Sequence, residues 1–225
     1  METYKRIGII GAMDAEIEGI TAAMTDKREE NIGGSSFVSG RLYGAEAVCV
    51  QSGIGKVNAA FAACTLIYRY GVQAVLMTGV AGALGGRLKH LDLVVPDGFI
   101  QHDVTMIGAD DGFIDIVGKV VLRPDKRLAD ALAGSNGIRG IMATGEQFIE
   151  KEEQKKAILS RFPEVIAADM ECAAVMQVCE RSGIPAACAK VISDGGSEGE
   201  YYEFKTKAAD KAVAAVLGAI KKLCR

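Results

Sequence analysis

Short apolar runs rich in β-branched residues alternate with longer segments of helical period, and this alternation most constrains how the chain can fold. Seven runs read as strands, and most of them end in Gly, Asp or Ser: RIGIIGAM, EAVCVQSG, QAVLMTGV, LDLVVPDG, IRGIMATGE, EVIAADME and AACAKVISDG. The segments of helical period are 14–24, 56–70, 126–133, 151–162, 170–182 and 203–223. The alternation predicts an α/β protein with a largely parallel or mixed sheet.

The remaining organisation is simple. SSFVSGRLYGAEAVCV has two alternating runs around a short Gly-containing turn, which predicts a β-hairpin. With 225 residues, 49% of them hydrophobic, the chain is long enough to bury a substantial core, so disorder is excluded. Four prolines and no charge block leave no evident linker, and we expect a single domain over residues 1–225.

The charge balance argues against nucleic acid and membrane partners. Lys and Arg total 26 against 29 Asp and Glu, with no basic cluster for a phosphate backbone or an anionic lipid surface. The start, METYKRIGIIGAM, lacks the features of a signal peptide. Five glycines interrupt the longest uncharged stretch, Tyr70 to Gly86, so a membrane span is not expected. These features predict a cytoplasmic location.

The cysteines and histidines do not predict a metal site. Six cysteines form no C-x-x-C pair, and most lie inside apolar runs, so we expect reduced, buried side chains. Only His90 and His102 are present, and no ligands stand at the spacing that zinc needs.

Acidic residues follow three of the predicted strands, where ligands of open α/β sheets bind. They are Glu16, Glu171 and Asp194. Each has an ordinary explanation: Glu16 and Glu171 suit helix N-termini, with Asp169 as a cap, and Asp194 precedes a Gly-Gly turn. Together they also suit glycoside cleavage, which needs separate carboxyl groups to protonate the leaving group and activate water.

Two further segments have alternative interpretations. SGIGKV lacks the first Gly and the final Ser or Thr of a phosphate-binding P-loop, so it is either a plain strand-to-helix turn or a glycine turn with its backbone against a ligand. RIGIIGAM lacks the third Gly of a dinucleotide-binding turn. Phe148, which follows TGEQ, either packs in the core or stacks on a planar ring.

These segments together resemble the 5′-methylthioadenosine/S-adenosylhomocysteine nucleosidases of the nucleoside phosphorylase superfamily. The resemblance runs nearly end to end, through IGIIGAMDAEI, SGIGKVNAA, TGVAGAL, TGEQFI, ADMECAA and VISDGG. It implies an α/β fold, a three-layer αβα sandwich around a mixed, partly barrel-like β-sheet. It also implies a homodimer that uses neither metal nor cofactor.

The resemblance assigns three catalytic roles. Glu16 matches the acid that activates the attacking water, at a place where phosphorylases have a phosphate-binding segment. Glu171 matches the acid that holds the ribose hydroxyls, and its charge suits an oxocarbenium-like transition state. Asp194 matches the general acid that protonates N7 of adenine.

The remaining substrate-binding positions also follow from the resemblance. Phe148 matches the ring that stacks on adenine, and the backbone of Gln147 and Ile149 reads the edge of the base. Met13, Ile54 and Tyr201 match positions that line the sugar and the 5′ substituent. Met170 accompanies Glu171 at the ribose, Val80 and Lys190 stand at positions that support the water site, and Ser193 completes the expected substrate-binding set.

The sequence departs from close relatives at several positions. Val80 stands where they usually have Ser, Lys190 where they usually have Arg, and Asp169 where Glu is common. We expect Lys190 to approach the cleft on the same strand face as Asp194 and to support Glu16 or the water. The segment from Asp103 to Ile107 is expected to reach the partner subunit's site, but it begins with about two residues fewer than in many relatives.

The leading functional hypothesis is hydrolysis of an adenine nucleoside's N-glycosidic bond. A second hypothesis keeps the reaction but changes the substrate to aminodeoxyfutalosine or another 5′-modified purine nucleoside. A phosphorylase is third, and Glu16 disfavours it because a carboxylate repels phosphate. A non-catalytic purine-binding module is disfavoured because all three proposed catalytic acids are present.

Overall fold

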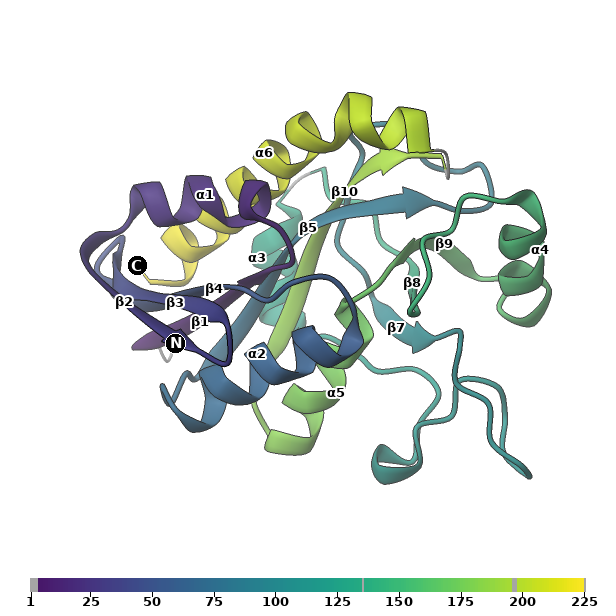
Figure 1. Cartoon of the computed structure of the whole chain (residues 1–225), viewed down its shortest axis with the longest axis horizontal. Coiled ribbons are helices and arrows are strands. Elements are labelled where there is room, and N and C mark those ends of the chain that lie inside the picture. Colours follow the sequence, from purple (N-terminus) through teal and green to yellow (C-terminus); the bar gives the residue numbers. More distant parts are fainter. Residues whose placement is uncertain (1–3, 135, 196–197, 225) are drawn as a thin grey trace.

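The computed structural model describes residues 4–134, 136–195 and 198–224. Within these ranges a mixed ten-stranded sheet lies between two layers of helices (Figure 1). The strands are β1 (Arg6–Gly11), β2 (Thr25–Ile32), β3 (Ser35–Leu42), β4 (Ala45–Gln51), β5 (Ala74–Ala83), β6 (Leu93–Val94), β7 (Gly98–Gln101), β8 (Ile141–Thr144), β9 (Val165–Asp169) and β10 (Ala186–Asp194). All seven strands expected from the apolar runs are present.

The sheet has the order β2-β3-β4-β1-β5-β9-β8-β7, and β10 pairs with β5 and with the short β6. Strand β1 is parallel to β4 and β5, and β10 is parallel to β5. The predicted hairpin is confirmed as antiparallel β3 and β4, while β5 pairs antiparallel with β9. The α/β prediction with a mixed sheet is therefore confirmed, although the sheet does not close into a barrel.

The helices begin and end close to the expected segments. They are α1 (Asp14–Ala23), α2 (Lys56–Tyr68), α3 (Lys126–Ala133), α4 (Glu152–Arg161), α5 (Cys172–Ser182) and α6 (Glu198–Leu223), with a short 3-10 helix at Asp115–Val117. Helix α6 begins five residues before the predicted Glu203, so Tyr201 lies in its first turn.

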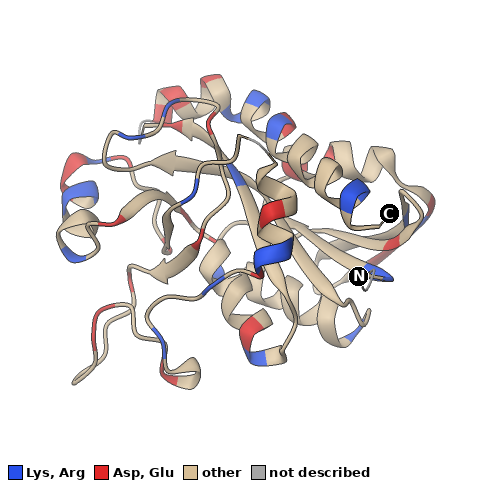
Figure 2. Cartoon of the chain, turned by 180° about the vertical axis from the view of Figure 1, so that it is seen from behind, with Lys and Arg blue, Asp and Glu red and all other residues tan. Residues whose placement is uncertain are grey.

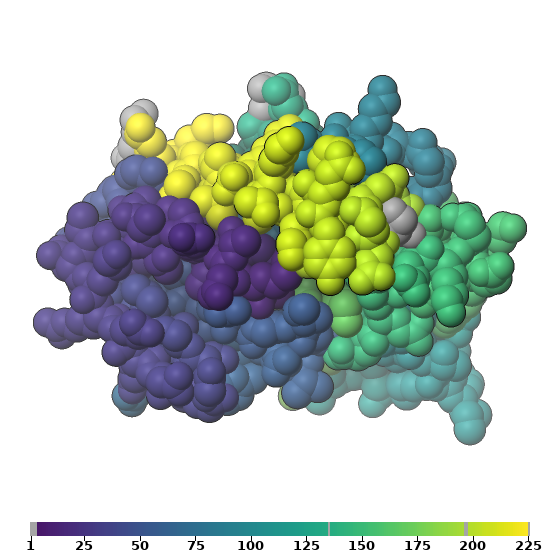
Figure 3. Space-filling view, turned by 45° about the horizontal axis from the view of Figure 1, so that its top comes forward, coloured from purple at the N-terminus to yellow at the C-terminus, as the bar shows by residue number. Residues whose placement is uncertain are grey.

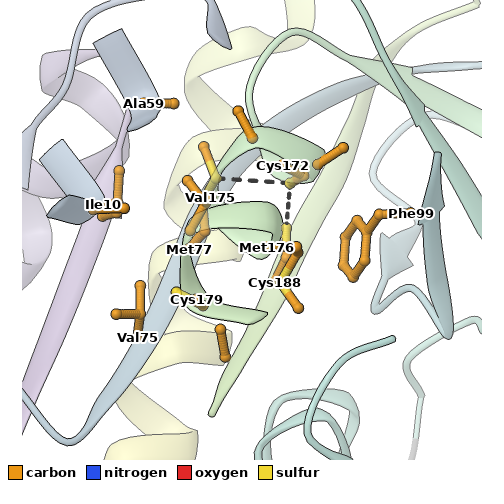
Figure 4. Close-up of a cluster of buried hydrophobic side chains, with 14 of the residues drawn as sticks. Ile10, Ala59, Val75, Met77, Phe99, Cys172, Val175, Met176, Cys179 and Cys188 are labelled. Carbon is orange, nitrogen blue, oxygen red and sulfur yellow. Dashed lines mark hydrogen bonds between the residues drawn. The ribbon is translucent and has the colours of Figure 1, made fainter. Parts of the chain in front are cut away.

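Two apolar clusters fill the space on the two faces of the sheet. One packs α2 and α5 against the sheet, and the other packs α1, α3 and α6 against the opposite face. The first cluster holds Cys172 and Cys188, whose sulfurs lie 2.7 Å apart beside Met77 (Figure 4). All six cysteines are free, as expected, although Cys64 and Cys224 are only partly buried.

Charged side chains are distributed over the surface. Figure 2 shows Lys and Arg interspersed with Asp and Glu along the helices and loops of one side. In the part of the chain that the structure describes, no helix is long and apolar enough to cross a membrane.

Candidate active site

A cavity of about 410 Å³ opens where several strands end. Figure 3 shows four segments that converge on this side of the molecule: the purple turn after β1, the blue turn after β4, the green segment before α4 and the yellow-green start of α6. The lining includes every residue that the sequence suggested for the site except Lys190. The structure therefore brings together Glu16, Glu171 and Asp194 from three distant parts of the chain.

Glu16 is held by backbone amides at the start of α1. Its Oε2 accepts hydrogen bonds from the N–H groups of Ala12 (2.6 Å) and Met13 (3.0 Å), and Oε1 accepts one from Val80 (2.9 Å). The side chain is 1% exposed yet lines the cavity. The helix-capping role and the position in the site are therefore both present.

Glu171 lies between β9 and α5 and is held by the glycine turn of SGIGKV. Its Oε1 accepts a hydrogen bond of 3.0 Å from the N–H of Gly55, whose φ of 100° is a conformation that favours glycine. The turn thus donates its backbone to a carboxylate of the site, and it is more than a connection. Burial raises the pKa of Glu171 to about 7; Asp169 and Glu16 add to the increase, while Lys190 and the Gly55 N–H oppose it.

Asp194 ends β10 and is 2% exposed. The Oγ of Ser193 donates a hydrogen bond of 2.7 Å to its Oδ2. A register shift between Ile192 and Asp194 interrupts the pairing of β10 with β5, so simple alternation does not describe this end of the strand.

Aromatic rings form one wall of the cavity. Phe148 is 41% exposed and makes an edge-to-face contact with Tyr201, with ring centroids 5.6 Å apart. Tyr201 in turn contacts Tyr202, and its hydroxyl donates to Met13 Sδ at 3.1 Å. The exposed ring of Phe148 is available to a planar ligand rather than packed in the core.

The rest of the predicted lining is arranged around these groups. Gln147 and Ile149 flank Phe148, Met170 precedes Glu171, and Ile54 and Val80 also line the cavity. Ile54 is 53% exposed, so it stands at the mouth.

Lys190, which we expected to approach the cleft on the same strand face as Asp194, lies behind the residues that line the cavity. Its side chain is 1% exposed, and Nζ lies 3.2 Å from Asp169 Oδ2 and 3.4 Å from Glu171 Oε2. Neither a hydrogen bond nor an ion pair joins it to Glu16. Lys190 therefore contacts Asp169 and Glu171 from behind the lining.

Seven lining residues were not predicted from the sequence. They are Ala12, Ala81, Gly82, Leu84, Ala168, Asp169 and Tyr202. The small and aliphatic members carry no chemical signal. Asp169 is a buried acid two residues from Glu171, and it also has the predicted role of a helix cap, because its Oδ2 accepts a hydrogen bond of 2.9 Å from the Cys172 N–H.

The segment that was expected to reach a neighbouring subunit lies outside this cavity. Asp103 accepts hydrogen bonds from Lys56 Nζ at 2.7 Å and from the Glu146 N–H at 2.9 Å. Beyond this anchored residue, Met106 is 41% exposed and Ile107 is fully exposed.

The arrangement suits acid–base chemistry on a nucleoside. One carboxylate held by backbone amides, a second near neutrality in pKa and a third beside a hydroxyl supply distinct proton-transfer and charge-stabilising groups. Among the described residues, no three or more His, Cys, Asp or Glu side chains gather in a way that could hold a metal ion.

Comparisons with known proteins agree with this geometry. The family model described as "Phosphorylase superfamily" matches residues 6–225. A 5′-methylthioadenosine/S-adenosylhomocysteine nucleosidase of Shewanella loihica is 34% identical over 97% of this chain and 100% of its own length.

Two solved structures are similar in sequence and fold. The Neisseria meningitidis 5′-methylthioadenosine/S-adenosylhomocysteine nucleosidase, in complex with methylthio-immucillin-A, has a TM-score of 0.93 and 31% identity, covering 97% of this chain and 99% of that one. A futalosine hydrolase mutant of Helicobacter pylori has a TM-score of 0.91 and 30% identity over 97% and 99%. The chain therefore belongs to the phosphorylase superfamily and, within it, to the family of the 5′-methylthioadenosine/S-adenosylhomocysteine nucleosidases.

Proposed function

We propose that the chain hydrolyses the N-glycosidic bond of 5′-methylthioadenosine and S-adenosylhomocysteine, releasing adenine and a 5′-thio-substituted ribose. The observation that carries the proposal is that Glu16 shares one cavity with Glu171 and Asp194. A buried carboxylate at this place repels phosphate and can accept a proton from water, which favours hydrolysis over phosphorolysis.

The three acids divide the reaction between them. Water attacks C1′ while Glu16 takes one of its protons. The C1′–N9 bond breaks, its electron pair goes to the base, and Asp194 supplies the proton that N7 of adenine receives. Glu171 binds the ribose hydroxyls and stabilises the positive charge that develops on the sugar.

The other lining residues bind the substrate. Phe148 stacks on adenine, and the backbone of Gln147 and Ile149 reads its edge. Ser193 fixes Asp194, in keeping with their 2.7 Å hydrogen bond. The sugar and its 5′ group contact the set Met13, Ile54, Val80, Met170 and Tyr201, whose mostly apolar side chains suit a thioether.

The decisive experiment measures adenine release from 5′-methylthioadenosine in phosphate-free buffer that contains a chelator. We expect turnover with release of free 5-methylthioribose. Activity that needs phosphate and yields a sugar 1-phosphate would contradict the role of Glu16. Binding without turnover would favour the purine-binding module.

A second candidate substrate is aminodeoxyfutalosine, which differs from methylthioadenosine in its 5′ group. The similarity to the Helicobacter pylori futalosine hydrolase mutant supports this alternative, because that enzyme has the same fold as this chain. Comparing kcat/KM for the two nucleosides decides between them.

The whole chain, residues 1–225, acts in this proposal as one nucleoside phosphorylase-like catalytic domain in a homodimer. Val57, Phe61 and Tyr68 lie on α2 and are 79%, 41% and 74% exposed, which is unusual for large apolar side chains in one helix. The surface suits a second copy, whose Asp103 to Ile107 segment would cover the mouth at Ile54.

The cytoplasmic location stays a prediction from the sequence, and cell fractionation tests it.

A further inference from the structure

Three charged side chains form a buried group at the wall of the cavity: Asp169 and Glu171 belong to the lining, and Lys190 lies behind them. Lys190 in β10 is 0% exposed, Asp169 at the end of β9 is 8% exposed, and Glu171 before α5 is 5% exposed. The ammonium lies 3.2 Å from Asp169 Oδ2 and 3.4 Å from Glu171 Oε2. Since an unpaired charge is costly in a protein interior, each member depends on the others for its ionised state.

Asp169 is the fixed member of this group. Its Oδ1 accepts a hydrogen bond of 2.6 Å from Thr144 Oγ1, and its Oδ2 accepts one of 2.9 Å from the Cys172 N–H. The Thr144 hydroxyl is held in turn by the Ala173 N–H at 3.0 Å. The end of β8 and the first turn of α5 therefore determine where Asp169, and with it Lys190, can lie.

Glu171 is the member that faces the cavity. The Gly55 N–H holds Oε1, and Lys190 is the charged partner of Oε2. The absence of a side chain at Gly79 leaves room for Glu16 and Lys190. A methyl group there would collide with the Glu16 carboxylate and approach Lys190 Nζ to 3.0 Å.

The surrounding charges make the ammonium necessary. Burial alone lowers the pKa of Lys190, but the Cys172 sulfur and the carboxylates of Asp169, Glu171 and Glu16 raise it well above its usual value. Without the ammonium, three carboxylates would face one another in a buried space. The pKa of Glu171, which burial already raises to about 7, would then rise further, and Glu171 would hold a proton at neutral pH.

We propose that Lys190 and Asp169 are positioning residues for Glu171: Asp169 anchors the buried ammonium, and the ammonium favours the ionised form of the Glu171 carboxylate and directs it into the cavity. The inference rests on the proposed function only for the role of Glu171 on the sugar. It assigns Lys190 to Glu171 rather than to Glu16 or the attacking water.

The test is a rescue experiment with paired substitutions. Lys190→Met should lower kcat/KM for 5′-methylthioadenosine at pH 7 by roughly 100-fold, and the loss should shrink as the pH rises, because Glu171 then ionises only at higher pH. Lys190→Met combined with Asp169→Asn removes one of the carboxylates that repel Glu171. The double variant should therefore regain roughly tenfold over Lys190→Met. Lys190→Arg keeps the charge and should cost less than Lys190→Met.

Carbon-13 NMR titration of the glutamate carboxyl groups supplies a readout that does not need turnover. The Glu171 signal, assigned by its loss in Glu171→Gln, should titrate at higher pH in Lys190→Met and return toward the wild-type position in the double variant. Lys126→Met with Asp130→Asn is the control, because this exposed Lys–Asp pair on α3 lies 2.6 Å apart and is of the same chemistry. Lys190→Gln gives the same comparison if the Met variant does not fold.

Two results would overturn the inference: an unchanged Glu171 titration in Lys190→Met, or losses that simply multiply in the double variant. A wild-type protein that releases no adenine would contradict the proposed function instead, and the titration would still decide whether Lys190 controls the ionisation of Glu171.

Discussion

At the scale of single residues, the three acids of the cavity differ more in their contacts than in their chemistry. Glu16 is held by three backbone N–H groups, Asp194 by the hydroxyl of Ser193, and Glu171 by one N–H group and a buried ammonium. Carboxyl groups in different surroundings can take different parts in one reaction. Substitutions that keep the shape and remove the charge separate these parts.

Asp194→Asn should lower kcat by roughly 10² to 10⁴, the usual range for a general acid, and leave nucleoside binding nearly unchanged. The reason is that neutral adenine leaves only after protonation. Steady-state kinetics with 5′-methylthioadenosine measures the loss. A nitrophenyl riboside, whose leaving group needs no proton, should lose much less if the enzyme accepts it, and equal losses on both substrates would contradict the assignment.

Glu16→Gln and Glu171→Gln should separate water activation from sugar binding. The first variant should keep a tight site for a non-hydrolysable adenine nucleoside and lose turnover, whereas the second should weaken binding and turnover together. Titration calorimetry with the analogue measures both affinities. The division of roles is wrong if the two variants lose affinity to the same extent.

The raised pKa of Glu171 predicts opposite effects of pH on activity and stability. Activity needs the carboxylate, so kcat/KM should rise with pH through about 7. The folded protein holds this proton more tightly than the unfolded chain, whose ordinary value is 4.5. Its contribution to the free energy of unfolding is therefore complete below pH 4.5 and is lost as the pH rises through about 7. Denaturant unfolding across this range, compared with Glu171→Gln, measures the effect, and parallel curves would contradict it.

At the scale of elements, the turn between β4 and α2 holds a proposed catalytic side chain with a backbone N–H group. Gly55 has a φ of 100° and donates to Glu171, and a methyl group on it would lie 2.7 Å from Glu146 Oε2. The same turn places Ile54 at the cavity mouth. Its conformation therefore affects stability and the site together.

Gly55→Ala should destabilise the protein by about 1–3 kcal/mol, because alanine is strained at this φ. It should also weaken nucleoside binding, because the strained turn displaces the N–H that donates to Glu171. Thermal unfolding and calorimetry check the two effects. Gly44→Ala is the matched control, since Gly44 has a φ of 92° with open space around it. It should cost stability alone, and a Gly55→Ala protein with normal nucleoside affinity would show that the turn is not part of the site.

The sequence predicted elements well where apolar residues set the period. Helix α3 spans the expected residues, and the runs around β1, β5 and β10 all formed strands. It did not predict β2, because TDKREENI has no apolar alternation, and its pairing with β3 is a tertiary effect. The site was predictable where strand ends carry acids. The burial of Lys190 behind the cavity lining was not predictable, because strand alternation gives the direction of a side chain but not which residues cover it.

At the scale of the whole molecule, the exposed apolar face of α2 determines how copies associate in the proposed dimer. Val57→Asp puts a charge on that face, at its most exposed side chain, and should shift the protein toward monomers, which sedimentation velocity measures. Activity on S-adenosylhomocysteine should fall as the dimer dissociates, because the partner's segment no longer covers the 5′ group. Tyr43→Asp, an exposed position on the β3–β4 turn, is the control. A monomeric wild type, or a Val57→Asp dimer, would contradict the proposal.

The edge of the sheet, in contrast to α2, resists association between copies of the chain. Strand β2 ends the strand order, and seven of its eight residues are exposed, with five consecutive charges from Asp26 to Glu30. An unpaired edge is a template for uncontrolled strand addition and fibril growth, and a row of charged side chains resists it because they would lose their hydration in the new contact. The same strand that gave no apolar signal therefore protects the sheet from aggregation, and neutralising those five side chains would remove that protection without touching the cavity.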